Sequence, residues 1–207
     1  MNGKSWNAAL RISVVLAGLV LLSACAARPE PQVESLLDVP SGKAVVVGRI
    51  ELHPPLRSDE QDFGTDRGEE LKNAFILYCG DRPRDLTGMR HDDFSGSFAT
   101  TLDKNFFIKI DAGILLYVSG GTFYSASNLS DRIEPHTFSS QFQVELRPDD
   151  EAVYIGTIQY IRDESNNLAS IMIRDDYKGA DSEFKERFGT VKGLRKALLA
   201  PAAVCCK

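Results

Sequence analysis

Short strand-like segments separated by turn residues dominate this 207-residue chain. They are rich in β-branched and aromatic residues, many alternate in hydrophobicity, and turn residues such as glycine, proline and asparagine lie between them. We expect seven to nine strands, centred on residues 44–52, 73–79, 94–102, 105–111, 114–118, 122–127, 138–146, 152–161 and 168–173. Many short strands at close spacing predict an antiparallel β-sandwich over residues 43–176, with a partly open barrel as the alternative.

Three local features refine this prediction. Residues 152–161 are apolar on both alternating faces, which indicates a strand that is buried on both sides. The run Ser119-Gly120-Gly121 predicts a tight turn between two strands, because glycine reaches positive φ at little cost. Residues 57–70 are densely charged and contain two glycines, so we expect a solvated loop that is either disordered or a binding element.

The pattern changes from strand to helix after residue 176. Ala180, Phe184 and Phe188 are spaced by four with charged residues between them, which predicts an amphipathic helix ended by Gly189. Residues 194–199 suggest a second short helix. We therefore expect residues 177–207 to form a C-terminal helical segment and tail that packs on an edge or an open end of the sandwich.

The N-terminus has the layout of a bacterial lipoprotein signal peptide. Lys4 and Arg11 precede the apolar run 12–22, which is too short to span a bilayer comfortably. The run ends in Leu-Ser-Ala followed by Cys25, a lipobox pattern. We expect cleavage of residues 1–24, acylation of Cys25 with chains such as palmitate, and attachment to a membrane by that lipid. The alternative is an ordinary signal peptide cleaved near Ala24.

The residues after the lipobox predict a tether and an address. Residues 25–42 contain three prolines among polar residues, so we expect the acylated cysteine to be followed by a flexible tether. Ala26, rather than an aspartate, follows Cys25. In enteric bacteria an aspartate there retains lipoproteins at the inner membrane, so Ala26 favours an outer-membrane protein that faces the periplasm.

The charge balance excludes two classes of partner. Loss of residues 1–24 removes two basic residues and no acid, and moves the formal net charge from −5 to −7. Nucleic-acid binding and adhesion to anionic lipid both need clustered lysine and arginine, and the chain has no basic run. We therefore expect contact with the membrane through the lipid and no nucleic-acid partner.

Three cysteines remain after Cys25 is assigned to lipid. Cys79, Cys205 and Cys206 would lie in a compartment that permits disulfides. Adjacent cysteines rarely bridge each other, so we expect Cys79 to pair with Cys205 or Cys206, with Cys205 taken as the partner, and to pin the tail to the body. The alternative is that all three thiols stay reduced.

Two stretches resemble a known class of domain. Residues 106–110, Phe-Phe-Ile-Lys-Ile, lead to residues 114–124, which end Gly-Gly-Thr-Phe-Tyr, similar to prealbumin-like and carboxypeptidase-regulatory-like sandwich domains. Residues 152–158, Ala-Val-Tyr-Ile-Gly-Thr-Ile, resemble a strand of small bacterial lipoproteins of unassigned function. The resemblance covers about residues 100–190 and departs at Ser119, which replaces a proline. It implies a non-catalytic envelope protein and carries over no site residues.

Motifs for catalysis and metal binding are absent from the sequence. His53, His91 and His136 are far apart, and no metal-ligand spacing occurs. The acidic runs 91–93 and 149–151 fit turns better than a loose calcium site. No Gly-x-Ser-x-Gly motif is present. We therefore predict no metal, no cofactor and no enzyme activity; an enzyme would need His91 or His136 in a cleft beside a carboxylate.

These observations lead to two hypotheses about function. The first is a non-enzymatic lipoprotein that acts as an interaction or envelope-assembly module, with an envelope protein as its partner. The second is a small-ligand or carbohydrate-binding lipoprotein, in which the loop 57–70 lies near one end of the sandwich. A concave pocket lined by outward-facing aromatic residues would favour the second hypothesis.

Overall fold

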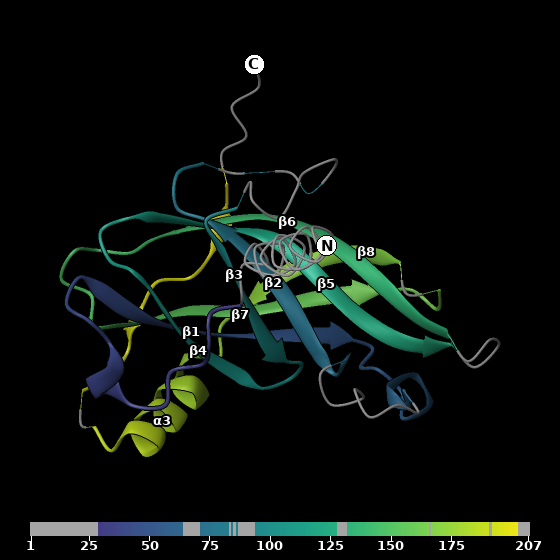
Figure 1. Ribbon diagram of the computed structural model, residues 1–207, viewed down its shortest axis with the longest axis horizontal. Coiled ribbons are helices and arrows are strands. Elements are labelled where there is room, and N and C mark those ends of the chain that lie inside the picture. The colour runs from purple at the N-terminus through teal and green to yellow at the C-terminus, as the bar shows by residue number, and fades with distance from the viewer. Residues whose placement is uncertain are drawn as a thin grey trace, which may run out of the picture.

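The structure, a computed structural model, describes residues 29–63, 71–82, 84, 86, 94–127, 132–165, 167–190 and 192–202. In this part of the chain two five-stranded sheets enclose a common core, and one α-helix lies outside them (Figure 1). The strands are β1 (Lys43–His53), β2 (Asn73–Cys79), β3 (Gly96–Thr101), β4 (Asn105–Asp111), β5 (Leu115–Ser127), β6 (Arg132–Glu145), β7 (Ala152–Arg162), β8 (Leu168–Arg174), β9 (Arg195–Lys196) and β10 (Ala200–Pro201). The helix is α3 (Tyr177–Phe188), and two 3-10 turns are η1 (Leu36–Asp38) and η2 (Asp59–Gln61).

Sheet B is mixed, whereas the prediction was a purely antiparallel sandwich; all strand pairs of sheet A are antiparallel. Sheet A has the order β10-β6-β5-β2-β3, and sheet B has the order β4-β1-β7-β8 with β9 also beside β7. The β1–β7 and β7–β9 pairs are parallel, and the other pairs are antiparallel. Strand β7 inserts between β1 and β8 and runs in the direction of β1. Hydrophobic alternation identifies a strand but not its neighbour, so the sequence could not reveal this parallel pair.

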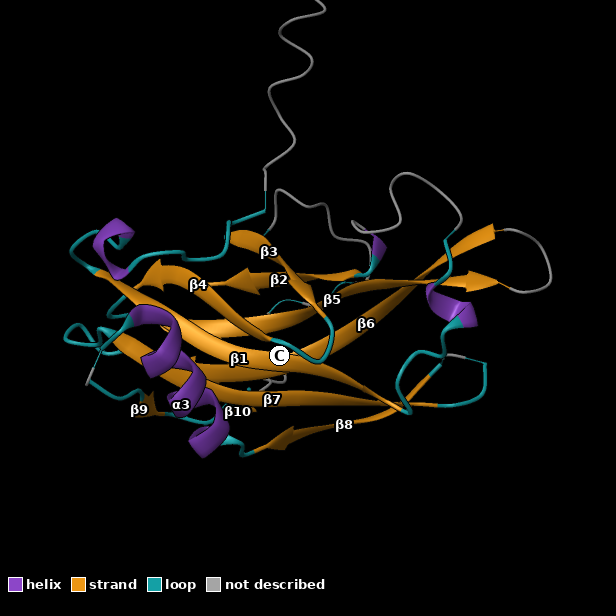
Figure 2. Cartoon of the chain, turned by 90° about the horizontal axis from the view of Figure 1, so that it is seen from below, coloured by secondary structure: helices purple, strands orange, loops and turns teal. Residues whose placement is uncertain are grey.

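Strand β7 is buried on both faces, as predicted. One face contributes Val153 and Ile155 to the main core between the sheets. The opposite face contributes Tyr154 to a second cluster, where α3 covers sheet B with Ala180 and Phe184 (Figure 2). The stripe spaced by four therefore forms the buried side of α3, and Gly189, with φ of 59°, ends the helix as expected.

The predicted turn at Ser119-Gly120-Gly121 is wrong, because β5 continues through it. Gly120 has φ of 133° and marks a register shift against both β2 and β6. A Cβ atom on Gly120 would overlap the carbonyl oxygen of Phe138, and one on Gly121 would overlap that of Phe75. The two glycines therefore form a bulge in a central strand, where neighbouring backbones approach closely.

The second predicted helix, at residues 194–199, is also wrong. Arg195–Lys196 is the short strand β9, and Leu199 N donates to the carbonyl of Ile155 at 2.9 Å. Leu194 and Leu199 are buried, but each packs into a different cluster. An extended segment can reach both clusters along β7, which explains why the apolar residues here do not indicate a helix.

One side of the molecule, where β3 of sheet A lies next to β4 of sheet B, is closed by residues predicted as tether. Gln32 donates to the Ala99 carbonyl at 2.9 Å and accepts from Phe107 N at 2.6 Å, so one side chain joins both sheet edges. Glu30 and Val33 add backbone bonds to Ser97 and Phe107, and Val33 is buried. We call residues 30–33 with the edges of β3 and β4 the closed seam; the folded part thus begins before Lys43.

Candidate functional site

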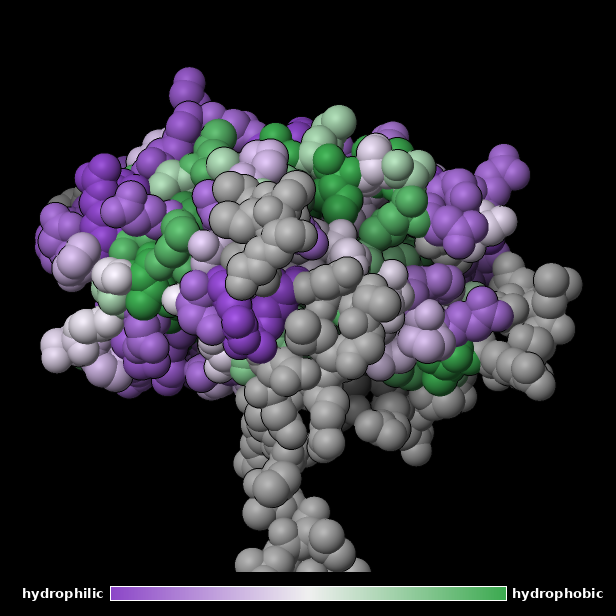
Figure 3. Space-filling model, turned by 90° about the horizontal axis from the view of Figure 1, so that it is seen from above, coloured by the Kyte–Doolittle hydropathy of each residue, from purple (hydrophilic) through white to green (hydrophobic). Residues whose placement is uncertain are grey.

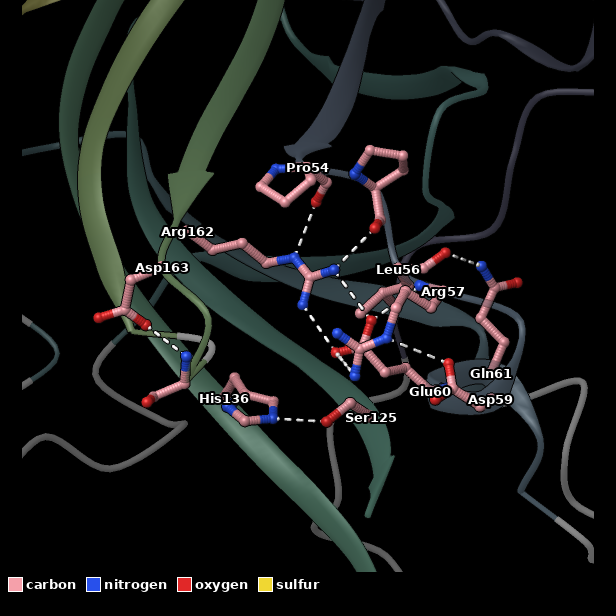
Figure 4. A network of polar contacts seen from close by, with 12 residues as sticks. Pro54, Leu56, Arg57, Asp59, Glu60, Gln61, Ser125, His136, Arg162 and Asp163 are labelled. Atoms are coloured by element: carbon pink, nitrogen blue, oxygen red, sulfur yellow. Dashed lines mark hydrogen bonds and ion pairs between the residues drawn. The ribbon is translucent and has the colours of Figure 1, made fainter. Parts of the chain in front are cut away.

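The loop after β1 is fixed at one end of the sandwich by a buried arginine. Arg162, the last residue of β7, donates from Nε to the carbonyl of Pro54 and from a terminal nitrogen to that of Pro55, both at 2.7 Å (Figure 4). Its two terminal nitrogens also contact the two carboxylate oxygens of Glu60 at 2.9 Å. The Arg162 and Glu60 side chains are 3% and 5% exposed, so this bidentate pair is almost dry. We call it the arginine clamp.

The clamp determines the shape of the loop more than it adds stability. Hydrogen bonds from Arg162 hold the pKa of Glu60 below its usual range despite burial. A buried ion pair roughly offsets its own desolvation, yet loss of one partner leaves an uncompensated charge. Glu60 also accepts from Arg57 N at 2.7 Å, so the clamp positions residues 54–61 in one conformation. The sequence pattern predicted a solvated loop for this segment and indicated neither residue of the clamp.

A serine–histidine pair lies beside the clamp, on the strands β5 and β6. Ser125 Oγ and His136 Nε2 are 2.7 Å apart, and the imidazole stacks on Phe123 with ring centroids 4.9 Å apart. Burial lowers the pKa of His136. Ser125 is buried, and among the described residues no carboxylate is hydrogen-bonded to the second nitrogen of His136. The pair therefore lacks the orienting third group of an activated nucleophile in the described part of the chain.

A small cavity lies on the other side of the clamped loop. Its volume is about 90 Å³, and its apolar walls include Leu52 of β1, Leu56 and Phe63 of the loop, and Leu102 of the β3–β4 turn. Asp103 of the same turn also lines it and has φ of 62°. The cavity lies near the end of the sandwich that the loop 57–70 is predicted to approach, and among the described residues Phe63 is the one aromatic residue in its wall.

The side of the sandwich opposite to the closed seam is open. Figure 2 looks onto sheet B, and no described segment lies beyond β8 at the lower margin of the sheet. Among the described residues none forms a backbone hydrogen bond with the outer edge of β8, which pairs with β7 alone. The core is incompletely covered here, since four of its side chains are only partly buried: Phe142, Leu168, Ile171 and Ile173. We call β8 with these side chains the open seam.

The two sheet edges that meet at the open seam differ in sequence. The first half of β6 also lacks a neighbour on its outer side among the described residues, but it contains Glu134 and Pro135. A charge and a proline are common protection for an edge strand. Strand β8 reads Leu-Ala-Ser-Ile-Met-Ile-Arg, with no proline, no glycine and a single charge at its end. Only β8 is therefore suited to pairing with another strand along its length.

Exposed apolar residues elsewhere are scattered. On the face drawn in Figure 3, opposite to α3, apolar residues form separate small patches between polar ones. In the described part of the chain Met172 of β8 is the second most exposed large apolar residue, at 47%, after Leu37 at 96%. The open seam therefore combines an unpaired backbone edge with apolar side chains.

The remaining residues singled out by the sequence have ordinary surroundings or lie outside the described part. Asp150 accepts from Arg147 N and pairs with Arg195, and Glu151 pairs with Lys192, so the acidic turn is bound by cations of the chain. His53 is exposed at the end of β1. Among the described residues no group of three potential metal ligands exists. Three singled-out segments lie outside the described residues: Cys25, residues 91–93, and Cys205 with Cys206.

Cys79 is a buried free thiol within the described part of the chain. It accepts a weak hydrogen bond from Ser119 Oγ at 3.9 Å and packs with Tyr117 and Ala202. Ala202 precedes Cys205 by three residues, a span that an extended chain covers in about 10 Å. Because Cys205 and Cys206 lie outside the described residues, the pairing of Cys79 with Cys205 stays a prediction.

Comparisons of the chain with family models, with curated proteins and with solved structures found no match. The resemblance to prealbumin-like domains and small lipoproteins therefore stays a prediction. Among the described residues, no helix has the length and apolar character needed to cross a bilayer.

Proposed function

We propose that this chain is a non-enzymatic lipoprotein of the bacterial envelope that binds an extended segment of a partner protein along β8. The open seam carries this proposal. Acylation of Cys25 would hold the domain at the outer membrane, facing the periplasm, and the partner would be another envelope protein.

The chemistry of the edge specifies the kind of segment that fits. An added strand would supply the backbone partners that β8 lacks among the described residues. Because Leu168, Ile171 and Ile173 pack against the core while Met172 is exposed, the two faces of β8 are unequal. A partner segment with alternating apolar residues would cover the partly buried side chains, and its other face would remain polar. An extended strand of a partner protein is thus favoured over a helix or a flat surface.

Site-specific photo-crosslinking in cells tests the proposal. A photoreactive residue is placed at Met172 on the open seam and, as the matched control, at Gln141, an exposed position of β6 whose carbonyl accepts from Ala202 N at 2.7 Å. We expect a discrete adduct from position 172 and none from position 141. A Ser170→Lys change in the protein that carries the photoreactive residue at position 172 should remove the adduct, because lysine on an edge opposes strand addition.

Two results would contradict the proposal. One is the absence of any adduct at position 172, and the other is equal adducts from both positions. An adduct between two copies of this chain would replace the partner protein with self-association, which light scattering of the purified acylated protein would check.

A further inference from the structure

The cavity behind the clamped loop has walls that are held in place by contacts outside it. On one side, the arginine clamp fixes residues 54–60, and Gln61 donates from its side-chain amide to the Leu56 carbonyl at 2.9 Å. On the other side, Asp103 N donates to the Ile50 carbonyl at 2.9 Å and ties the β3–β4 turn to β1. The cavity is thus preorganised, which lowers the ordering cost of binding.

The polar groups of the cavity are unequally satisfied. Among the described residues, the Asp103 carboxylate has no hydrogen-bond or ion-pair partner. Asp103 is exposed at the mouth of the cavity, yet desolvation by its neighbours and the nearby charge of Glu51 raise its pKa, and Arg49 offsets this only in part. Lys72 also lines the cavity and is engaged in a contact of its own. A cationic group near Asp103 would therefore be stabilised.

Size limits the ligand to a short chain. An engineered cavity that binds benzene measures about 150 Å³, and this one measures about 90 Å³. An unbranched chain of four or five carbons would fit between Leu52, Leu56, Phe63 and Leu102, with its end near Asp103. The side-chain oxygen of Gln61 is a second acceptor in the same wall.

We propose that this cavity binds a short alkylammonium, with the alkyl chain against the four apolar walls and the ammonium donating to the Asp103 carboxylate. The inference does not depend on strand addition at the open seam, because the cavity lies at the end of the sandwich and shares no residue with β8. It assigns a ligand chemistry to the second hypothesis drawn from the sequence, small-ligand binding, and it does not support carbohydrate.

Calorimetric titration of the full acylated protein in detergent tests the inference. The probes are n-pentylamine and its neutral isostere 1-pentanol at pH 7. We expect the amine to bind at least tenfold more tightly than the alcohol, and Asp103→Asn to reduce that preference to less than threefold. Asp62→Asn is the matched control, because Asp62 lies in the same loop outside the cavity wall, and it should change neither affinity more than twofold. The control also removes effects of partition into detergent.

A pH titration keeps the test independent of any folding defect in the variant. In the wild-type protein, amine affinity should fall as pH drops through the pKa of Asp103, because the protonated carboxyl no longer attracts the ammonium. Equal binding of amine and alcohol, an amine affinity that ignores both Asp103→Asn and pH, or no binding of either probe would each overturn the inference.

Discussion

The two sides of the sandwich differ in how far the described part of the chain covers the sheet edges. At the closed seam, Gln32 bonds to β3 and β4 at once, and Val33 enters the cluster under α3. At the open seam, no described residue hydrogen-bonds to the outer edge of β8 or buries an apolar side chain beside it, and Ile171 and Ile173 stay partly buried. Within residues that the structure describes, the N-terminal segment thus covers the edges on one side of the sandwich, and the edge of β8 on the other side has no partner.

This difference indicates where a partner would gain most. Burial of apolar surface contributes about 25 cal/mol per Å², and an edge strand adds unpaired backbone groups to that gain. At the closed seam both contributions are already made within the chain. At the open seam they remain available to a second chain, which is why the comparison supports an interaction module. Substitutions on the two sides should therefore have different consequences.

Loss of the arginine clamp should have the largest effect. Arg162 ends β7, the strand beside the open seam, and Arg162→Ala leaves the Glu60 carboxylate buried without its bidentate partner. We expect a loss of about 3–5 kcal/mol in the free energy of unfolding, measured by urea denaturation. The double variant Arg162→Met with Glu60→Gln should recover a large part of that loss. A single variant within about 1 kcal/mol of wild type would show that water already reaches the pair.

Opening the closed seam should have the next largest effect. Gln32→Ala removes a bond to each sheet edge and leaves the Phe107 amide and the Ala99 carbonyl without that partner. We expect destabilisation of about 2 kcal/mol, together with faster hydrogen exchange in β3 and β4. Exchange in β8 should not change. Faster exchange across the whole domain, with no bias to β3 and β4, would mean that the seam is not a local closure.

The fold was predictable from sequence where the hydrophobic pattern of a strand is enough to identify that strand. The bounds of β2 and β4 match the expected segments, and the two-faced burial of β7 follows from the apolar residues on both of its alternating faces. The prediction failed where the local backbone conformation depends on contacts with segments that are distant in the sequence. At the bulge, the backbone of Phe138 approaches Gly120 and that of Phe75 approaches Gly121 from the neighbouring strands, and local glycine propensity cannot distinguish this from a turn.

The candidate sites were less predictable than the strands. Arg162 and Glu60 are separated by 102 residues, and each looks like a solvated surface residue in its own segment. The signal that could have revealed the clamp is an arginine that ends a strand apolar on both faces. The open seam depends on strand order, and no local pattern states which strand becomes the uncovered edge.

Acidification should destabilise the protein through protonation of His136, which lies on β6 at one side of the open seam. The pKa of His136 is lowered in the folded protein, chiefly by burial, below the ordinary value of 6.5. The unfolded chain therefore binds more protons just below that value, and stability should fall as pH drops from about 6.5 toward the folded pKa. We expect wild type to lose more stability than His136→Gln between about pH 7 and about pH 5.5 in urea denaturation. Parallel losses in both proteins would assign the pH dependence to other groups.

The smallest effect on stability should come from a charge placed on the open edge. Ala169→Lys adds a lysine to an exposed position of β8, and Ala99→Lys adds one to a half-buried position of β3 beside the Gln32 contact. We expect the first to stay within about 0.5 kcal/mol of wild type and the second to cost about 1 kcal/mol in the free energy of unfolding. In cells Ala169→Lys should have the larger effect on crosslinking. It should abolish the crosslink from position 172, whereas Ala99→Lys should leave that crosslink intact. A lysine on β8 that destabilised the purified protein as much as the lysine on β3 would mean that β8 is already covered within the chain, and the open seam would lose its role in binding.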